Sequence, residues 1–439
     1  MLLEKLEVNE IMIQKNNDGT LNEVRDKKVL FMGAIGGMAY AVRIAKEMGI
    51  HTVVLDYYSD SQAKEYADKS YDVSTTDFET IYKIMENEHI DGVFSGFSDV
   101  NLRGMEKVCG QFGLSCYANK EQISYTQDKN LFKELCNRYD VPTPKTYDMS
   151  AVEKISYPVI VKPADAYAAK GITICDSADK LQEAIEYAKG YSQKGDVTIE
   201  DYIEGAEVMV HYAVVNGKFR ITSVFERRIA ESFDASGKDI APVAIFNNDE
   251  FRKLILPYEN KLAKMYKSIG MENAVGFLQG KIRDESVYFF EMALRFGGNV
   301  SELFNKYFDG VDLIAEFVKY SVTGKMEAAI ADKLTTDWNG FDCNISLFLK
   351  PGIISSMEGE NFLDTCEEIV DIQRYASIGD KITQEITGTY KAIAYRLVCI
   401  TDSKESLINL ISKIQGKIAV YDENHHDLID WELLLTKLN

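Results

Sequence analysis

The sequence predicts a multidomain protein of mixed class, in which an open parallel α/β layer precedes α+β segments. Near the N-terminus, short apolar runs alternate with helical stretches, which is typical of βαβ units and a parallel sheet. Further along, two pairs of strand-like runs are joined by short turns, which indicates antiparallel hairpins. The chain has 439 residues, more than one hydrophobic core usually organises, so we expect about two to four domains.

The parallel layer is predicted to follow a polar lead that ends near residue 27. Its apolar runs are short and bounded by turn residues, as buried strands are, and each is followed by a stretch with helical periodicity. The expected elements are strands at 29–33, 52–56 and 92–95 and helices at 38–48 and 78–88.

A glycine-rich turn, Gly33-Ala34-Ile35-Gly36-Gly37, joins the first strand to the first helix. It is similar to a dinucleotide-binding turn, and Asp56, about 20 residues further on, could be the acid that binds a ribose in such a site. The defining G-x-G-x-x-G spacing is not met. A turn that only admits the helix close to the strand is the alternative, and we favour it.

The middle of the chain is predicted to be α+β with antiparallel strands. Asn216-Gly217 is the strongest local signal, because this pair readily adopts the positive φ angles of a type I′ hairpin turn. Expected strands are 157–163, 172–175, 197–203, 208–215, 219–225, 276–283 and 287–291, and expected helices are 128–139, 181–189 and one long helix at 249–269. Strands at 344–349 and 390–400 and a helix at 405–414 indicate a smaller C-terminal α+β domain.

Composition excludes several classes of protein. Hydrophobic residues make up 46% and charged residues 27%, which is the profile of a folded chain rather than a disordered one. The formal net charge of −20 would repel nucleic acid and anionic membranes, so we expect neither as a partner. We therefore expect the partners to be small-molecule substrates, and a homodimer is compatible with this composition.

The cysteines and the N-terminal residues indicate a cytoplasmic protein. Seven cysteines without CxxC or CxxH spacing argue against a disulfide framework or a structural zinc site. Glu and Lys interrupt the first residues before an apolar signal segment could form, and no run of 18 apolar residues occurs.

Five features follow one another in an informative order: Lys129 opening a helix, Lys162 ending a strand, a small-residue loop at 164–171, an acidic strand at 200–203, and a late E-x-x-x-R at 291–295. Together they resemble the ATP-grasp superfamily. The resemblance implies an ATP-grasp fold preceded by an open parallel, Rossmann-like α/β domain and followed by a C-terminal α+β domain. The implied division is an extension at 1–27, a pre-ATP-grasp domain at 28–118, the ATP-grasp domain at 119–335 with a lid at about 164–207, and a C-terminal domain at 336–439.

The resemblance implies that ATP is bound through its phosphates by Lys129 and Lys162, because compact cations must offset the charge of a triphosphate. The loop at 164–171 corresponds to the family's glycine-rich lid, with Lys170 and Gly171 at its end. Alanines and Tyr167 replace most of the expected glycines, so a plain hairpin loop is the rival interpretation.

The acidic strand is similar to the family segment that holds the adenosine part of ATP. By this resemblance Glu200, Asp201 and Ile203 bind the adenine edge and Glu207 bonds the ribose hydroxyls. Carboxylates suit a ribose because each accepts two hydrogen bonds. An exposed acidic turn is the alternative.

The second hairpin corresponds to the family's magnesium site. Glu291 matches the acid of E-x-N-x-R, but Ala293 stands in place of the Asn, and the first metal acid is replaced by Gln279. A Gln can ligate through its carbonyl oxygen, although the site loses one negative charge. The site is either a working one for Mg²⁺, with Mn²⁺ as an alternative, or that of a relative that binds nucleotide without turnover.

Arg295 is placed by the resemblance near the acyl phosphate, where it would oppose developing charge, with Lys170 as a second catalytic cation. A salt bridge to a neighbouring acid is the alternative for Arg295. We therefore expect an ADP-forming ligase that joins an amino acid or small carboxylated metabolite to an amine. Rival readings are a bicarbonate- or formate-activating enzyme like the carboxylases and purine-synthesis relatives, a nicotinamide oxidoreductase, and a nucleotide sensor.

Overall fold

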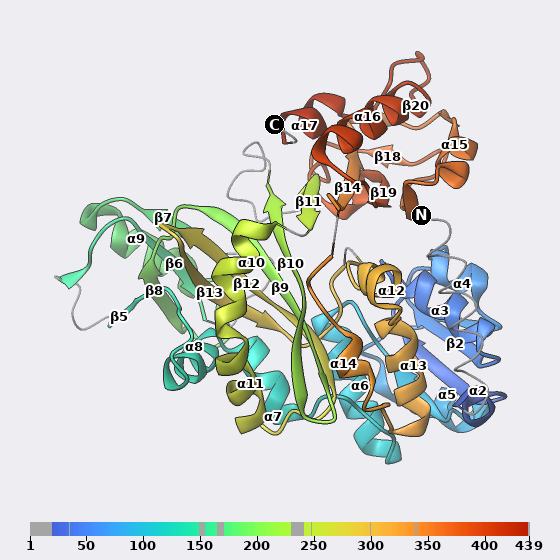
Figure 1. Ribbon diagram of the computed structural model, residues 1–439, viewed down its shortest axis with the longest axis horizontal. Coiled ribbons are helices and arrows are strands. Elements are labelled where there is room, and N and C mark those ends of the chain that lie inside the picture. Colours follow the sequence, from blue (N-terminus) through green and yellow to red (C-terminus); the bar gives the residue numbers. More distant parts are fainter. Residues whose placement is uncertain are drawn as a thin grey trace.

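The computed structural model describes residues 20–34, 36–148, 154–164, 171–229, 241–246, 248–298, 300–338 and 340–437. In Figure 1 a large central sheet lies in the middle, a small sheet lies at the left, the N-terminal layer lies at the lower right and the C-terminal region lies at the upper right. This mixture of parallel and antiparallel sheets confirms the predicted fold class. Within the described ranges, no helix has both the length and the apolar character needed to cross a bilayer.

The N-terminal layer is a four-stranded parallel sheet with the order β3-β2-β1-β4. Its strands are β1 (Lys28–Met32), β2 (His51–Asp56), β3 (Lys69–Asp72) and β4 (Gly92–Phe94), with helices α2 (Thr20–Val24), α3 (Met38–Glu47), α4 (Gln62–Tyr66), α5 (Phe78–Glu88) and α6 (Asp99–Phe112). The predicted strands and helices are all present. The sequence did not predict β3, because this edge strand is short and largely polar.

The glycine-rich turn between β1 and α3 is in contact with other residues of the N-terminal layer. Asp56 accepts hydrogen bonds from the backbone nitrogens of Ala34 (2.9 Å) and Tyr58 (3.0 Å). A Cβ atom on Gly37 would lie 2.4 Å from the ring of Phe97, so only glycine fits there. These contacts favour the packing interpretation of the turn over the dinucleotide-binding one.

The small sheet is antiparallel, with the order β5-β8-β6-β7. It is built from β5 (Thr146–Tyr147), β6 (Val159–Pro163), β7 (Thr173–Cys175) and β8 (Val197–Asp201) and covered by α9 (Leu181–Lys189). Its apolar side chains, among them Val159, Ile185 and Ile199, form a hydrophobic cluster separate from the rest of the protein. The small sheet is therefore a packing unit of its own.

The central sheet has eight antiparallel strands in the order β13-β12-β9-β10-β11-β14-β19-β17. These are β9 (Ala206–Val215), β10 (Lys218–Arg228), β11 (Val243–Phe246), β12 (Ala274–Arg283), β13 (Ser286–Ala293), β14 (Cys343–Phe348), β17 (Ile369–Arg374) and β19 (Ile393–Cys399). Asn216 and Gly217 have positive φ angles of 48° and 77°, as the predicted hairpin turn requires. Strands before and after residue 335 belong to this one sheet, whereas the predicted domain division places a boundary at that residue.

The prediction of one long helix at 249–269 is wrong. It is interrupted by a 3₁₀ turn, Leu256–Tyr258, that separates α10 (Asp249–Ile255) from α11 (Glu259–Ser268). Pro257 explains the break, because it has no backbone N–H to donate and its ring clashes with the preceding helical turn.

Further helices connect the layers. They are α7 (Lys120–Gln127), α8 (Lys129–Arg138), α12 (Leu303–Asp309), α13 (Leu313–Thr323) and α14 (Ile330–Lys333). Phe296, which follows β13, packs against Phe94 of β4 and Phe317 of α13, with ring centroids 6.2 and 5.6 Å apart. The N-terminal layer and the central sheet thus share one hydrophobic core.

The C-terminal region forms a second core around β14 and β19. Its remaining elements are β15 (Gly352–Ile353), β16 (Ser356–Glu358), α15 (Glu360–Thr365), β18 (Lys381–Ile382), α16 (Lys404–Gln415), β20 (Ala419–Tyr421) and α17 (Trp431–Thr436). The strand predicted at 390–400 begins at Ile393, after a 3₁₀ turn at Tyr390–Ala392.

Candidate active site

Two buried lysines share one buried glutamate. Lys162, at the end of β6, pairs with one carboxylate oxygen of Glu200 on β8, and Lys133 of α8 pairs with the other. Lys162 is 4% exposed and Glu200 is 2% exposed. Lys162 lies opposite Thr198 in the sheet, so Glu200, two residues on, projects from the same face. The register of β6 and β8 therefore builds this contact.

The lysine cluster contains more lysines than carboxylates that could balance them. Burial lowers the pKa of Lys162 well below its usual range, the charges of Lys133 and Lys129 lower it further, and Glu291 acts in the opposite direction. Burial likewise lowers the pKa of Lys133 to about 7. Lys129, Lys162 and Glu291, which are far apart in sequence, thus lie within electrostatic range of one another.

Gln279 and Glu291 lie directly opposite each other on β12 and β13. Cross-strand pairs of this kind have Cβ atoms about 4.5–5.5 Å apart, so the two side chains share one face of the hairpin. Phe290, next to Glu291, lies with its ring 5.9 Å from Nζ of Lys162, which places the hairpin beside the lysine cluster. Ala293 projects from the same face as Glu291 and offers no ligand there.

The pair of oxygen donors fits a weakly held divalent cation. Among the described residues, no group of three or more His, Cys, Asp or Glu side chains could hold a metal ion. Gln279 and Glu291 supply two oxygens, and a Mg²⁺ ion commonly completes its octahedral shell with water and substrate phosphates. The donor set is therefore compatible with Mg²⁺ that is bound together with a nucleotide.

The residues expected around adenosine lie on neighbouring strands. Glu207, at the start of β9, pairs with Arg227, which lies opposite it on β10. Asp201 accepts a hydrogen bond from the hydroxyl of Tyr147 (2.7 Å). Ile203 is buried after β8. The nucleotide contacts expected of these residues remain predictions.

Arg295 forms the salt bridge that was the alternative interpretation of this residue. Its Nε lies 3.0 Å from Oδ2 of Asp99, the first residue of α6, and its guanidinium carbon is 5.1 Å from the ring centre of Phe277. Its Nη1 also donates to the carbonyl of Phe296 (3.0 Å). Arg295 thus lies at the junction of the N-terminal layer and the central sheet.

Most of the loop expected at 164–171, Lys170 included, lies outside the described ranges, whereas the rest of the predicted lid, up to residue 207, is described. Gly171 is described and has a φ of +74°. A Cβ atom there would lie 2.8 Å from Cγ of Pro163, the last residue of β6. Glycine is therefore required at this position by both backbone angle and packing.

Sequence reasoning missed Lys133. It lies four residues after Lys129 on α8, so the two lysines are on the same face of the helix, and this spacing could have indicated a shared site. It also missed Glu302, which accepts a hydrogen bond from Gly297 N (3.0 Å) and lies 3.1 Å from Nδ1 of the buried His211. No local sequence pattern around Glu302 indicates that its side chain contacts Gly297 and His211.

Comparisons with known proteins identify the class. A family model described as the C-terminus of D-Ala D-Ala ligase matches residues 131–241, the stretch that contains Lys133, Lys162 and the acidic strand but not Lys129. Among solved structures, the fold resembles phosphoribosylglycinamide synthetase from Anaerococcus prevotii, with a TM-score of 0.74, 17% identity and coverage of 91% of this chain and 100% of that one. An L-amino acid ligase from Bacillus licheniformis gives a TM-score of 0.72 at 14% identity, with coverage of 91% and 100%.

A third neighbour is the biotin carboxylase domain of 2-oxoglutarate carboxylase from Hydrogenobacter thermophilus, solved with MgADP, ADP and bicarbonate. Its TM-score is 0.75 at 18% identity, with 94% of each chain covered. The protein thus has the ATP-grasp fold, and these comparisons confirm the resemblance to the ATP-grasp superfamily that its motifs indicate.

Curated relatives are carbamoyl phosphate synthases. The chain is 26% identical over 353 residues to the C-terminal section of the large chain from Methanocaldococcus jannaschii, covering 74% of this chain and 55% of that protein. It is 25% identical over 247 residues to the large chain from Clostridium beijerinckii, covering 53% and 23%. The chain spans about half the length of the first relative and about a quarter of the second.

Proposed function

We propose that the protein is an ATP-dependent carboxylate–amine ligase that forms an acyl phosphate and releases ADP and phosphate. Lys129 and Lys162 bind the phosphates of ATP, and Glu200, Asp201, Ile203 and Glu207 surround its adenosine part. An amino acid or another small carboxylated metabolite is the acid, and an amine is the acceptor. The names of its fold neighbours, which include a synthetase and an amino-acid ligase, support this class of reaction.

The excess of lysines over carboxylates at this site carries the proposal. Three lysines act on one another around Lys162, and their nearest counter-charges are those of Glu200 and Glu291. A buried charge is stable only when it is paired, so a group of this kind favours an anionic ligand. A triphosphate supplies that charge, and its binding would restore the pKa of Lys162 toward the usual range.

Glu291 and Gln279 would hold the divalent cation, Mg²⁺ or alternatively Mn²⁺. The cation supplies neutralisation of the β- and γ-phosphate charge. Phosphoryl transfer depends mainly on position and electrostatics, so the task of Lys129 and Lys162 is to hold the γ-phosphate in line with the substrate carboxylate. Arg295 would oppose the negative charge that grows as the amine attacks.

Two alternatives have specific support. A bicarbonate-activating reaction is favoured by the carbamoyl phosphate synthase relatives and by the neighbour solved with bicarbonate. A nucleotide sensor without turnover is favoured by Gln279 and Ala293, which leave the cation site with fewer carboxylates than the family pattern. Both readings use the same ATP-binding residues.

A phosphate-release assay separates these functions. Purified protein with MgATP is supplied with bicarbonate or with pairs of small carboxylates and amines, and nucleotide products are resolved by chromatography. A ligase releases ADP and phosphate only with a carboxylate–amine pair, and the Glu291→Gln variant serves as the inactive control. Release of AMP and pyrophosphate, or ATP binding without turnover of any pair, would refute the proposal.

A further inference from the structure

Arg396 is a buried arginine that is held by uncharged acceptors. It lies on β19 and is 7% exposed. Its Nε donates to the hydroxyl of Ser346 (3.1 Å), and its Nη1 donates to the hydroxyl of Tyr375 (3.2 Å) and to the carbonyl of Gly298 (2.7 Å). A guanidinium stays charged inside a protein, and burying a charge away from a carboxylate costs stability. A cation that is kept at such a cost indicates a role beyond packing.

The register of the central sheet determines where this guanidinium lies. Arg396 is directly opposite Ser346 on β14 and directly opposite Gln373 on β17. Residues that are directly opposite project from the same face of a sheet, so the three side chains form one polar row across three strands. Tyr375 follows two residues after Gln373, and its hydroxyl donates to Oε1 of Gln373 (2.6 Å). The position of Arg396 is thus built by strand pairing.

Arg396 holds the turn that follows Arg295. Nη1 of Arg295 donates to the carbonyl of the next residue (3.0 Å), and the N–H of that same peptide group, which belongs to Gly297, donates to the buried Glu302 (3.0 Å). One residue further, the carbonyl of Gly298 accepts from Arg396. Two buried charged side chains therefore fix two peptide groups of the turn beside the guanidinium of Arg295.

The turn needs these contacts because its own backbone does not favour its shape. Val300, at its end, has a φ of +54°, which a β-branched residue adopts only at a cost. Gly298 is exposed, and a Cβ atom there would meet no other atom within 4 Å. A turn with strain and open space beside it can move. The hydrogen bonds of Arg396 and Glu302 therefore offset the strain and hold the turn in place.

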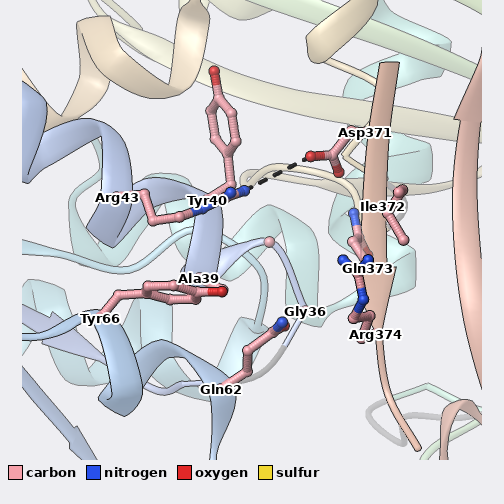
Figure 2. A pocket seen from close by; sticks show the side chains of 11 residues that line it. Gly36, Ala39, Tyr40, Arg43, Gln62, Tyr66, Asp371, Ile372, Gln373 and Arg374 are labelled. Atoms are coloured by element: carbon pink, nitrogen blue, oxygen red, sulfur yellow. Dashed lines mark ion pairs between the residues drawn. The ribbon is translucent and has the colours of Figure 1, made fainter. Parts of the chain in front are cut away.

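The polar row continues to the N-terminal layer. Asp371, two residues before Gln373 on β17, lines a polar pocket opposite α3 and pairs across it with Arg43, whose Nη2 lies 3.8 Å from Oδ1 of Asp371 (Figure 2). Burial raises the pKa of Asp371, whereas the Arg43 guanidinium and the Gln373 amide beside it lower that pKa. A continuous line of polar contacts therefore joins α3 through β17 to Arg396.

We propose that Arg396 is a positioning residue for the reaction, which fixes the Gly297-Gly298 turn, and with it Arg295, from the C-terminal region. The inference rests on the proposed ligase function for the role of Arg295, but not for the order of the turn. The other residues proposed for the reaction all precede residue 296, so this contact gives the C-terminal region a part in it.

Hydrogen exchange of the intact, nucleotide-free protein tests the positioning without turnover. The readout is the Gly297 amide, because its bond to Glu302 breaks when the turn moves. We expect Arg396→Met to speed its exchange by about tenfold, for the loss of one hydrogen bond from a charged group. Arg396→Lys keeps the charge and a donor and should give a smaller increase. Ile411→Val, in the C-terminal core, is the matched control for a general loss of stability and should leave this amide unchanged.

The phosphate-release assay gives a second readout with a substrate pair that turns over. Arg396→Met should lower kcat by about tenfold and leave the KM for ATP unchanged, since a displaced turn affects the step at Arg295 and not nucleotide binding. Titration of ATP sites with a fluorescent analogue corrects kcat for any loss of folded protein. Tyr375→Phe removes only a hydroxyl and should act in the same direction by about threefold, and it replaces Arg396→Met if that variant does not fold.

The outcomes separate this inference from the proposed function. Unchanged exchange of the Gly297 amide in both Arg396→Met and Tyr375→Phe overturns the inference. So does an Arg396→Met variant that keeps its kcat with a working substrate pair. Faster exchange in a protein that turns over no substrate pair supports the positioning of the turn and refutes the ligase function alone.

Discussion

Replacing Lys162 by Met should weaken ATP binding strongly while leaving the fold stable. Lys162 and Lys133 share the single carboxylate of Glu200, which cannot balance both lysines in their charged forms, and burial lowers the pKa of each lysine. Removing Lys162 leaves Glu200 with Lys133 as its one buried partner. Met fills nearly the same volume with an apolar chain, so the change removes a costly buried charge without opening a cavity.

The size of the effect follows from what the lysine is expected to contact. A hydrogen bond to a charged group contributes about 1.5–3 kcal/mol, which corresponds to an affinity loss of about 10- to 150-fold. The free energy of unfolding should change by less than about 1 kcal/mol, because the variant loses an ion pair but also loses the burial of a charge.

Two measurements on the same samples check this prediction. Titration with a fluorescent ATP analogue gives the affinity, and chemical unfolding monitored by circular dichroism gives the stability. The surface variant Lys189→Met on α9, whose lysine pairs with Glu186 in solvent, controls for loss of a lysine. An unchanged ATP affinity in Lys162→Met would refute the placement of the phosphates at this cluster.

Further predictions concern the same site. Glu200→Gln should destabilise the fold by about 3–5 kcal/mol in chemical unfolding, because it leaves two buried lysines without a carboxylate. Arg295→Ala should lower kcat by about 10²- to 10³-fold in the phosphate-release assay. Gln279→Glu should lower the Mg²⁺ concentration needed for half-maximal ATP turnover by about tenfold, because it restores a negative ligand. Since burial holds the pKa of Lys133 at about 7, its amine is largely neutral at pH 8, and a bound triphosphate should recharge it. Nucleotide binding at pH 8 should then take up protons, measured by titration calorimetry in buffers of different ionisation enthalpy, and affinity should fall as pH rises above 7.

Each of these predictions has a result that contradicts it. Glu200→Gln with wild-type stability would mean that the two lysines find other counter-charges. An Arg295→Ala variant that binds weakly but keeps its kcat would assign the arginine to substrate binding alone. Equal heats of nucleotide binding in all buffers would show that Lys133 does not titrate, and Lys133→Met is the variant that should abolish proton uptake.

Most helices and strands could be predicted from sequence because their signals are local. Three examples are the apolar residues of β1, the Asn216-Gly217 turn and the capping of α8 by Asp128. Each of these signals depends only on residues that are close together in the sequence. The break at Pro257 was equally local and was overlooked because the apolar period continues on both sides of it. The edge strand β3 was missed because its sequence is polar and only its pairing with β2 makes it a strand.

The site could be predicted only in part, because a sequence motif indicates candidate residues but not the residues that contact them in the folded protein. Lys162 and Glu291 were found through the order of the motifs, and the structure brings them into one electrostatic environment. The contact of Lys133 with Glu200 joins segments 67 residues apart, and that of Arg396 with Gly298 joins β19 to the turn that follows β13. Such long-range contacts are set by sheet register, which the sequence alone did not supply.

The small sheet has a consequence for the modularity of the protein. Its first strand, β5, pairs with its last, β8, so Thr146 lies beside Glu200 and the chain enters and leaves the unit at one point. A segment with adjacent ends and its own core can be exchanged between relatives as a cassette. A cut at residue 336, by contrast, would separate β11 from β14 and expose two bare strand edges, which are prone to aggregate. Homologous recombination should therefore tolerate crossovers near 145 and 202 far better than one between the central strands.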